Sequence, residues 1–68
     1  MIVTLNGEPA ELRDSATVED AVVASGAPSP HRGVAVAVDG EVVPRGEWDG
    51  TRLEEGQRVE VLRAVQGG

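Results

Sequence analysis

The stretch VAVAV at Val34–Val38, followed directly by Asp39-Gly40, decides the fold of this chain. Its alternation of large and small residues predicts a strand whose valines face a core and whose alanines face the other side. A strand that is apolar on both faces usually lies inside a sheet or under a partner. Asp-Gly is a strong signal for a two-residue hairpin turn, so residues 41–43 are predicted to return as a short strand that ends before Pro44.

A second hairpin is predicted at the start of the chain, where Asn6-Gly7 gives the same kind of turn signal. Residues 1–5 are apolar and β-branched and form its first strand, and Pro9–Arg13 is predicted as the return strand. Proline has no backbone N–H to donate to a neighbouring strand, so we expect this return strand at an edge of the sheet.

Between the two hairpins the apolar residues follow a helical period. Thr17 is predicted as the N-cap, Asp20 as its partner in a variant of the capping box, and Gly26 as the C-terminal stop. One face of this helix is predicted to consist of Val18, Ala21, Val22 and Ser25. The prolines at positions 28 and 30 predict a loop after it.

The remaining segments complete the order of elements. Residues 45–50 are predicted to be irregular, Leu53 to enter the core, residues 54–57 to turn, and residues 58–61 to open the last strand. The helix then connects two hairpins, which allows the first and last strands to pair in parallel at the centre of the sheet. This order predicts an α+β domain with the ubiquitin-like β-grasp fold, a mixed sheet of four to five strands with one helix packed on one face. The domain is expected to span residues 1–63, and residues 64–68 are expected to form a flexible tail that ends in Gly-Gly.

The composition excludes several classes of function. With 68 residues the chain has room for one domain, and its net charge of −6 leaves too few cations for a face that binds nucleic acid. Lysine and cysteine are absent, which excludes Schiff-base chemistry, thiol nucleophiles and disulfides. No apolar run approaches the ~20 residues that span a bilayer, so no membrane is expected. The lack of cysteine favours an intracellular, cytoplasmic location.

The side chains offer no constellation typical of an active site. His31 is the only histidine and is predicted to lie in a loop without a partner. The three serines, Ser15, Ser25 and Ser29, have no base nearby in the sequence. The acidic pairs Glu19-Asp20 and Glu54-Glu55 fit a helix N-terminus and a solvated turn better than general acid–base work. We therefore expect no enzyme, no metal site and no bound cofactor.

The unusual feature is the end of the sequence, Gly67-Gly68. Terminal glycines are commonly only a frayed tail. Here they follow the last predicted strand after three residues, Ala64, Val65 and Gln66, and the domain before them is predicted as a β-grasp. A segment without Cβ atoms can enter a narrow channel of another protein. The group of interest is then the α-carboxylate of Gly68, displayed on a flexible stalk.

Three pieces of the second half carry a specific resemblance. They are Val43-Pro44-Arg45 with Trp48 three residues on, Glu55-Gly56 before Val59-Glu60-Val61, and the end Ala64-Val65-Gln66-Gly67-Gly68. In these the chain resembles the ThiS family, the sulfur carriers of thiamine biosynthesis. The first half agrees in pattern, with Asn6-Gly7 and Thr17-Val18 in the expected places.

The resemblance implies a function in which the chain is a covalent cosubstrate. In this family an E1-like adenylating enzyme uses ATP to convert the C-terminal carboxylate, here Gly68, into an acyl adenylate. A sulfur donor such as a cysteine desulfurase persulfide then replaces AMP and leaves a C-terminal thiocarboxylate. Thiazole synthase takes that sulfur to build the thiazole ring. The part of the tail that would enter each partner consists of Val65, Gln66 and Gly67.

A partner interface is predicted on the face of the sheet opposite the helix. If Val59 and Val61 point into the core, Leu62 falls on that opposite face with Ala35 and Ala37. Arg63, together with Arg58, is predicted to supply charge at its rim. Trp48 is interpreted as a lid over the core, with a partner contact as the alternative.

Three other functions share parts of this pattern. The first is the small sulfur-carrier subunit of molybdopterin synthase, which has the same fold and terminus. The second is a ubiquitin-type modifier that is conjugated to protein lysines. The third is a plain β-grasp interaction domain with an incidental tail, because fold alone does not decide function.

Overall fold

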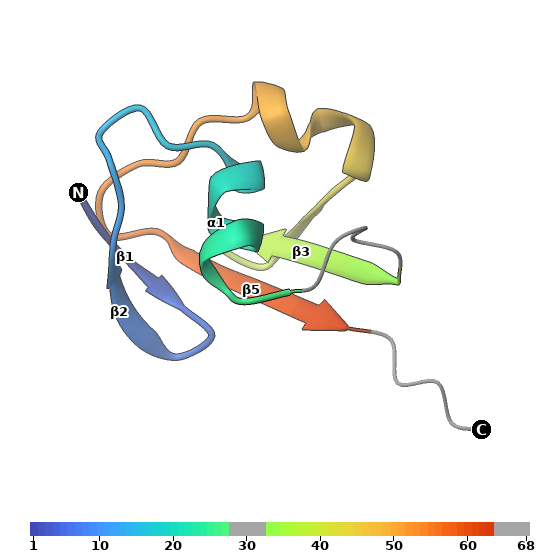
Figure 1. Cartoon of the computed structure of the whole chain (residues 1–68), viewed down its shortest axis with the longest axis horizontal. Coiled ribbons are helices and arrows are strands. Elements are labelled where there is room, and N and C mark those ends of the chain that lie inside the picture. The colour runs from blue at the N-terminus through green and yellow to red at the C-terminus, as the bar shows by residue number, and fades with distance from the viewer. Residues whose placement is uncertain (28–32, 64–68) are drawn as a thin grey trace.

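The structure is a computed structural model and describes residues 1–27 and 33–63. These residues form a five-stranded sheet, one α-helix and one 3₁₀-helix (Figure 1). In chain order the elements are β1 (Ile2–Leu5), β2 (Glu8–Glu11), α1 (Val18–Ala24), β3 (Val34–Val38), β4 (Glu41–Val43), the 3₁₀-helix η1 (Arg45–Gly50) and β5 (Arg58–Arg63). The predicted loop that contains Pro28, Pro30 and His31 lies outside the described residues.

The sheet has the order β2-β1-β5-β3-β4, and α1 lies across one of its faces (Figure 1). Strands β1 and β5 pair in parallel, and the other neighbours pair antiparallel. The predicted parallel pairing of the first and last strands is therefore confirmed, and so is the ubiquitin-like β-grasp fold. Strand β2, which contains Pro9, lies at an edge as its missing N–H requires.

Both hairpin turns have the backbone that their sequences predict. Asn6 and Asp39 each have a φ of 50°, and the glycines after them have φ values of 85° and 86°. Positive φ at both central positions is the geometry of a type I′ turn, which asparagine, aspartate and glycine tolerate best. The two-residue turns fix the register, so that Leu5 lies opposite Glu8 and Val38 opposite Glu41.

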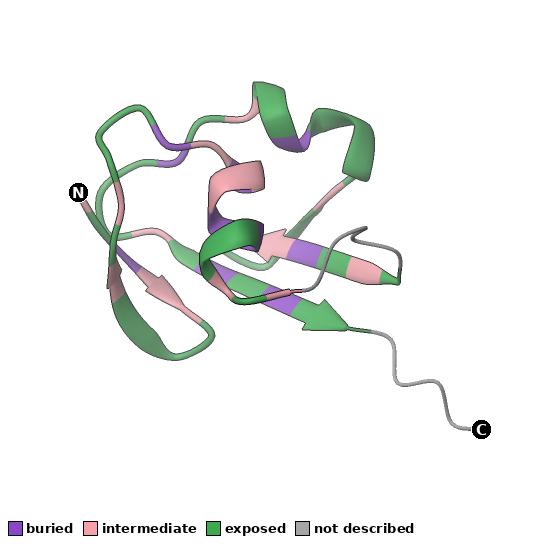
Figure 2. Ribbon diagram, viewed as in Figure 1, coloured by how far each residue is buried: buried purple, intermediate pink, exposed green. Residues whose placement is uncertain are grey.

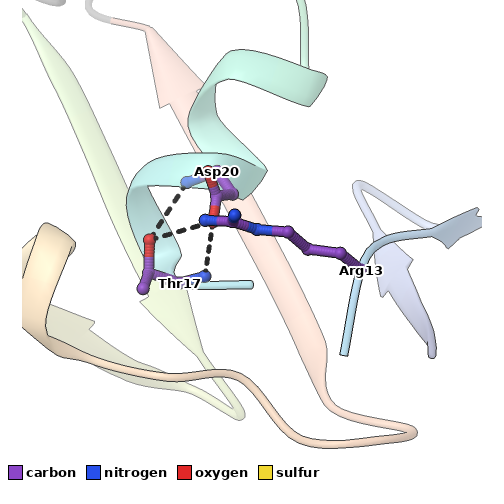
Figure 3. Close-up of polar contacts among 3 residues, drawn as sticks. All are labelled: Arg13, Thr17 and Asp20. Carbon is purple, nitrogen blue, oxygen red and sulfur yellow. Dashed lines mark hydrogen bonds and ion pairs between the residues drawn. The ribbon is translucent and has the colours of Figure 1, made fainter. Parts of the chain in front are cut away.

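Helix α1 begins with the predicted cap. Asp20 N–H donates to Thr17 Oγ1 over 3.4 Å, and Thr17 N–H donates to Asp20 Oδ2 over 2.9 Å (Figure 3). Arg13 Nη2 reaches the same carboxylate oxygen at 2.9 Å. The Thr17 backbone hydrogen bond, helped by the Arg13 hydrogen bond, lowers the pKa of Asp20 below its usual value of 3.8. The cap satisfies amide groups that the first turn of a helix leaves unpaired.

The hydrophobic core lies between α1 and the inner face of the sheet. Along β5 buried and exposed positions alternate, as Figure 2 shows. Trp48 is 2% exposed, and its Nε1 donates to the backbone oxygen of Val43 over 2.9 Å. The interpretation of Trp48 as a lid over the core is therefore confirmed. The core consists of Val3, Val18, Ala21, Val22, Val36, Trp48, Leu53, Val59 and Val61.

Two sequence predictions of local structure were wrong. Residues 45–50 form a 3₁₀-helix and are not irregular, because Glu47 N–H bonds to Pro44 O at 2.8 Å and the turn carries Trp48 into the core. The second strand spans Glu8–Glu11 and not residues 9–13, because a two-residue turn at Asn6-Gly7 starts the return strand at Glu8. In the described ranges no helix has the length and apolar character needed to cross a membrane.

Candidate functional site

Four apolar side chains form a strip across the sheet on the face away from α1. Leu62 of β5 lies opposite Ala35 of β3, and Ala37 lies opposite Val42 of β4. Leu62 is 65% exposed and Val42 is 73% exposed, although both are large aliphatic residues. We call these four residues (Ala35, Ala37, Val42, Leu62) the outer-face patch. An exposed apolar cluster of this kind on a small acidic domain is typical of a protein-binding surface.

The alternation of the strands places this patch where the sequence predicts it. Val36 and Val61 pair with each other and are buried, so their chain neighbours point to the opposite face. The three predicted members, Ala35, Ala37 and Leu62, are brought together. Val42 was missed, although the two-residue turn at Asp39-Gly40 is enough to place it opposite Ala37.

The two predicted rim cations fall on different faces. Arg63 pairs with Val34, whose side chain packs against the core, so Arg63 belongs to the helix side of the sheet and not to the patch face. Arg58 alternates with Val59 and lies on the patch face, with Glu60 between it and Leu62. The charge beside the outer-face patch is therefore mixed, from Glu60 and Arg58.

The residues predicted to carry the chemistry follow directly after β5. Val65, Gln66, Gly67 and Gly68 lie outside the described residues. Strand β5 ends at Arg63, next to Leu62 of the outer-face patch. Within residues 1–27 and 33–63, no three His, Asp or Glu side chains are grouped in a way that could hold a metal ion.

Comparison with known proteins gives the family. The model of the ThiS family matches residues 3–68, which is nearly the whole chain. The chain belongs to the ThiS family. The resemblance seen in the sequence is thereby confirmed.

Solved ThiS structures share the fold. The crystal structure of the thiamine biosynthesis protein ThiS from Geobacter metallireducens matches with a TM-score of 0.79 and 31% sequence identity, and all of both chains is covered. A solution NMR structure of a thiamine biosynthesis protein from the same organism matches with a TM-score of 0.78 and 31% identity, over 100% of this chain and 88% of the other. A comparison with curated proteins gives no significant match.

Proposed function

We propose that this ThiS-family chain carries sulfur for thiazole formation in thiamine biosynthesis, bound to the carboxyl carbon of Gly68. One observation carries the proposal: the family match runs through the fold and on to Gly68 itself, so it includes the Gly-Gly segment. The proposed chemistry takes place at the terminal carboxylate and uses no side chain of this chain. The domain supplies a stable body, a docking face and a terminal carboxylate.

The proposed reaction has three steps. A carboxylate is a poor electrophile, so an adenylating enzyme first joins the Gly68 carboxylate to the α-phosphate of ATP and releases pyrophosphate. A persulfide sulfur of the donor then attacks the acyl carbon, AMP leaves, and an acyl disulfide forms. A thiol finally attacks the sulfur atom that belongs to the donor and supplies the two electrons that break the S–S bond. The products are the thiocarboxylate on Gly68 and a new disulfide between the thiol and the donor.

We propose that the outer-face patch docks the adenylating enzyme. It is the exposed apolar strip that includes Leu62, and Leu62 is six residues before Gly68. A partner that covers the patch therefore holds the point from which the reactive tail departs. The remaining partners of the proposal, thiazole synthase and the sulfur donor, act on the same terminal carbon.

Two tail variants test the reaction. Deletion of Gly68, or Gly67→Val, is expected to abolish ATP–pyrophosphate exchange with the adenylating enzyme, because misplacing a reacting atom by about 1 Å can cost ~100-fold in rate. The melting temperature should not change, because both positions follow the end of β5 at Arg63. Gly50→Val is the matched control: an added Cβ at Gly50 meets no atom within 4 Å, and exchange should persist. Full exchange activity in both tail variants would overturn the proposal.

Mass spectrometry of the protein purified from its host distinguishes the alternatives. A mass gain equal to the replacement of one oxygen by sulfur supports a sulfur carrier. Covalent adducts with other proteins support a ubiquitin-type modifier, and unmodified protein under all conditions supports a plain interaction domain. The acceptor that co-purifies with the tagged chain, thiazole synthase or the large subunit of molybdopterin synthase, decides between the two carriers.

A further inference from the structure

The two hairpin turns each lend a side-chain oxygen to the central strand β5. Asn6 Oδ1 accepts the backbone N–H of Val61 over 2.8 Å, and Asp39 Oδ1 accepts the backbone N–H of Arg58 over 2.9 Å. Asn6 and Asp39 occupy the same place in their turns, each with a φ of 50°. The two bonds are therefore alike in geometry, with an amide oxygen as the acceptor at Asn6 and a carboxylate oxygen at Asp39. The Asp39 bond holds the start of β5, and the Asn6 bond holds a residue near its end.

The Asn6 side chain replaces a missing backbone acceptor. Thr4 N–H bonds to Gln57 O and Asn6 N–H bonds to Val59 O, both at 2.9 Å, which is the pattern of a parallel pair. The next bond in that pattern would join Val61 N–H to the backbone carbonyl of Asn6. The positive φ of Asn6 turns the chain into the hairpin at this point, and the side-chain carbonyl accepts the Val61 bond instead.

This bond lies near the end of the strand that leads to the tail. The residue pairs between β1 and β5 end at Leu5 and Val59. Among the described residues, the Asn6–Val61 bond is thus the last that the first hairpin makes to β5. Only Leu62 and Arg63 remain in the strand beyond Val61.

We propose that Asn6 is a positioning residue for adenylation, which acts through Val61 by fixing the direction in which the chain leaves β5. This inference rests on the proposed function, because it concerns the delivery of the Gly68 carboxylate to ATP. Without the bond, β3 is the one strand among the described residues whose backbone still pairs with the last residues of β5. The carboxylate then occupies its reactive position in a smaller fraction of the bound complexes, which lowers kcat and leaves docking through the outer-face patch intact.

Matched glycine variants separate this role from a general loss of stability. Glycine accepts the positive φ of both turns, so Asn6→Gly and Asp39→Gly each remove one acceptor from β5 and keep the hairpin. Both should lower the melting temperature, and Asp39→Gly at least as much, because it removes a charged acceptor. Only Asn6→Gly should lower the kcat of ATP–pyrophosphate exchange, by about 10-fold, with the KM for the carrier unchanged. Asn6→Asp keeps an acceptor and should restore kcat.

Amide hydrogen exchange of the carrier alone gives a second, independent measurement. The Val61 amide should exchange faster in Asn6→Gly than in Asp39→Gly, and the Arg58 amide should show the reverse. An equal loss of kcat in the two glycine variants, or unchanged protection of Val61 in Asn6→Gly, would overturn the role of Asn6. A wild-type protein that the adenylating enzyme does not activate would instead overturn the proposed function.

Discussion

The two faces of the sheet are built from the same strands and have opposite properties. Val61 and Leu62 are neighbours in the chain, yet Val61 is 7% exposed and Leu62 is 65% exposed. On β3 the same contrast separates buried Val36 from exposed Ala35. Burial of an apolar side chain on the inner face stabilises the fold, whereas an exposed apolar side chain on the outer face contributes much less to stability. The inner face therefore specifies the structure, and the outer face remains available for the partner contact that we propose.

The largest loss of stability is expected from Trp48→Ala, which removes the largest side chain of the core between α1 and the inner face. The loss should be about 3–5 kcal/mol in the free energy of unfolding, a large share of what a small domain has. Urea unfolding followed by circular dichroism measures it. Trp48→Phe loses the bond to Val43 O but keeps an aromatic ring in the core. Its free energy of unfolding should therefore fall less than that of Trp48→Ala. Equal unfolding midpoints for wild type and Trp48→Ala would contradict the placement of this residue in the core.

A smaller loss is expected from Val61→Ala or Val36→Ala, the central pair of the inner face. Each removes buried methyl groups and should lower the free energy of unfolding by roughly 1–3 kcal/mol. Ala37→Ser, on the outer face of the same sheet, is the control and should change it little. Thermal melts compare the three variants, and a neutral Val61→Ala would show that the register of β5 is wrong.

The cap of α1 should contribute less again, and in a manner that depends on pH. Asp20→Ala should lower the free energy of unfolding by about 1 kcal/mol at pH 7. It removes the carboxylate that accepts the Thr17 N–H and pairs with Arg13. The carboxylate is 35% exposed, so solvent screens the Arg13 pair. The pKa of Asp20 is lowered in the folded state, so its stabilisation is present above pH 3.8 and is lost as pH falls through the lower folded value.

Melting temperatures of wild type and Asp20→Ala across this range measure the effect. The gap between them should be widest near neutral pH and should close below the ordinary aspartate pKa. Arg13→Ala leaves the Thr17 bond in place. Its melting temperature at neutral pH should therefore lie between those of wild type and Asp20→Ala. A gap that widens on acidification would contradict the lowered pKa.

The smallest effect on stability, and a large effect on binding, is expected for charged substitutions in the outer-face patch. Leu62→Asp should change the free energy of unfolding by less than about 0.5 kcal/mol, because the Leu62 side chain is 65% exposed. Ala37→Asp should lose somewhat more, up to about 1 kcal/mol, because it places a carboxylate directly opposite Glu60. Affinity for the adenylating enzyme should fall at least ~10-fold, since a charge would be buried at the interface. Val23→Asp adds the same charge at an exposed aliphatic site on α1 and should leave affinity unchanged. Normal binding by both folded patch variants would remove the patch from the proposal.

Most of the fold follows from local signals in the sequence. Alternation in residues 34–38, two turn dipeptides and the Thr17 cap each depend on neighbours in the chain, and each was predicted correctly. The patch residues follow from the same alternation. The 3₁₀-helix could not be predicted because its six residues have no clear periodicity, and its shape depends on the burial of Trp48 and on the bond from Glu47 N–H to Pro44 O.

The contacts that could not be predicted join residues far apart in the chain. The bond from Val61 N–H to Asn6 Oδ1 spans 55 positions. The bond forms because β1 ends at Leu5 while β5 continues past Val59, which leaves the Val61 N–H beside the Asn6 side chain. This arrangement is a property of the assembled sheet. The turn dipeptide Asn6-Gly7 correctly predicts the hairpin, yet no local pattern indicates that the Asn6 side chain also accepts a hydrogen bond from a distant strand.

The buried indole of Trp48 also makes the protein its own spectroscopic reporter. The chain has one tryptophan and neither tyrosine nor phenylalanine, so its near-ultraviolet fluorescence comes from a single ring. That ring lies in the core, on the opposite side of the sheet from the outer-face patch. Its emission should therefore shift to longer wavelength when the domain unfolds and remain constant when a partner docks. An unlabelled sample can thus show whether a variant that no longer binds is still folded.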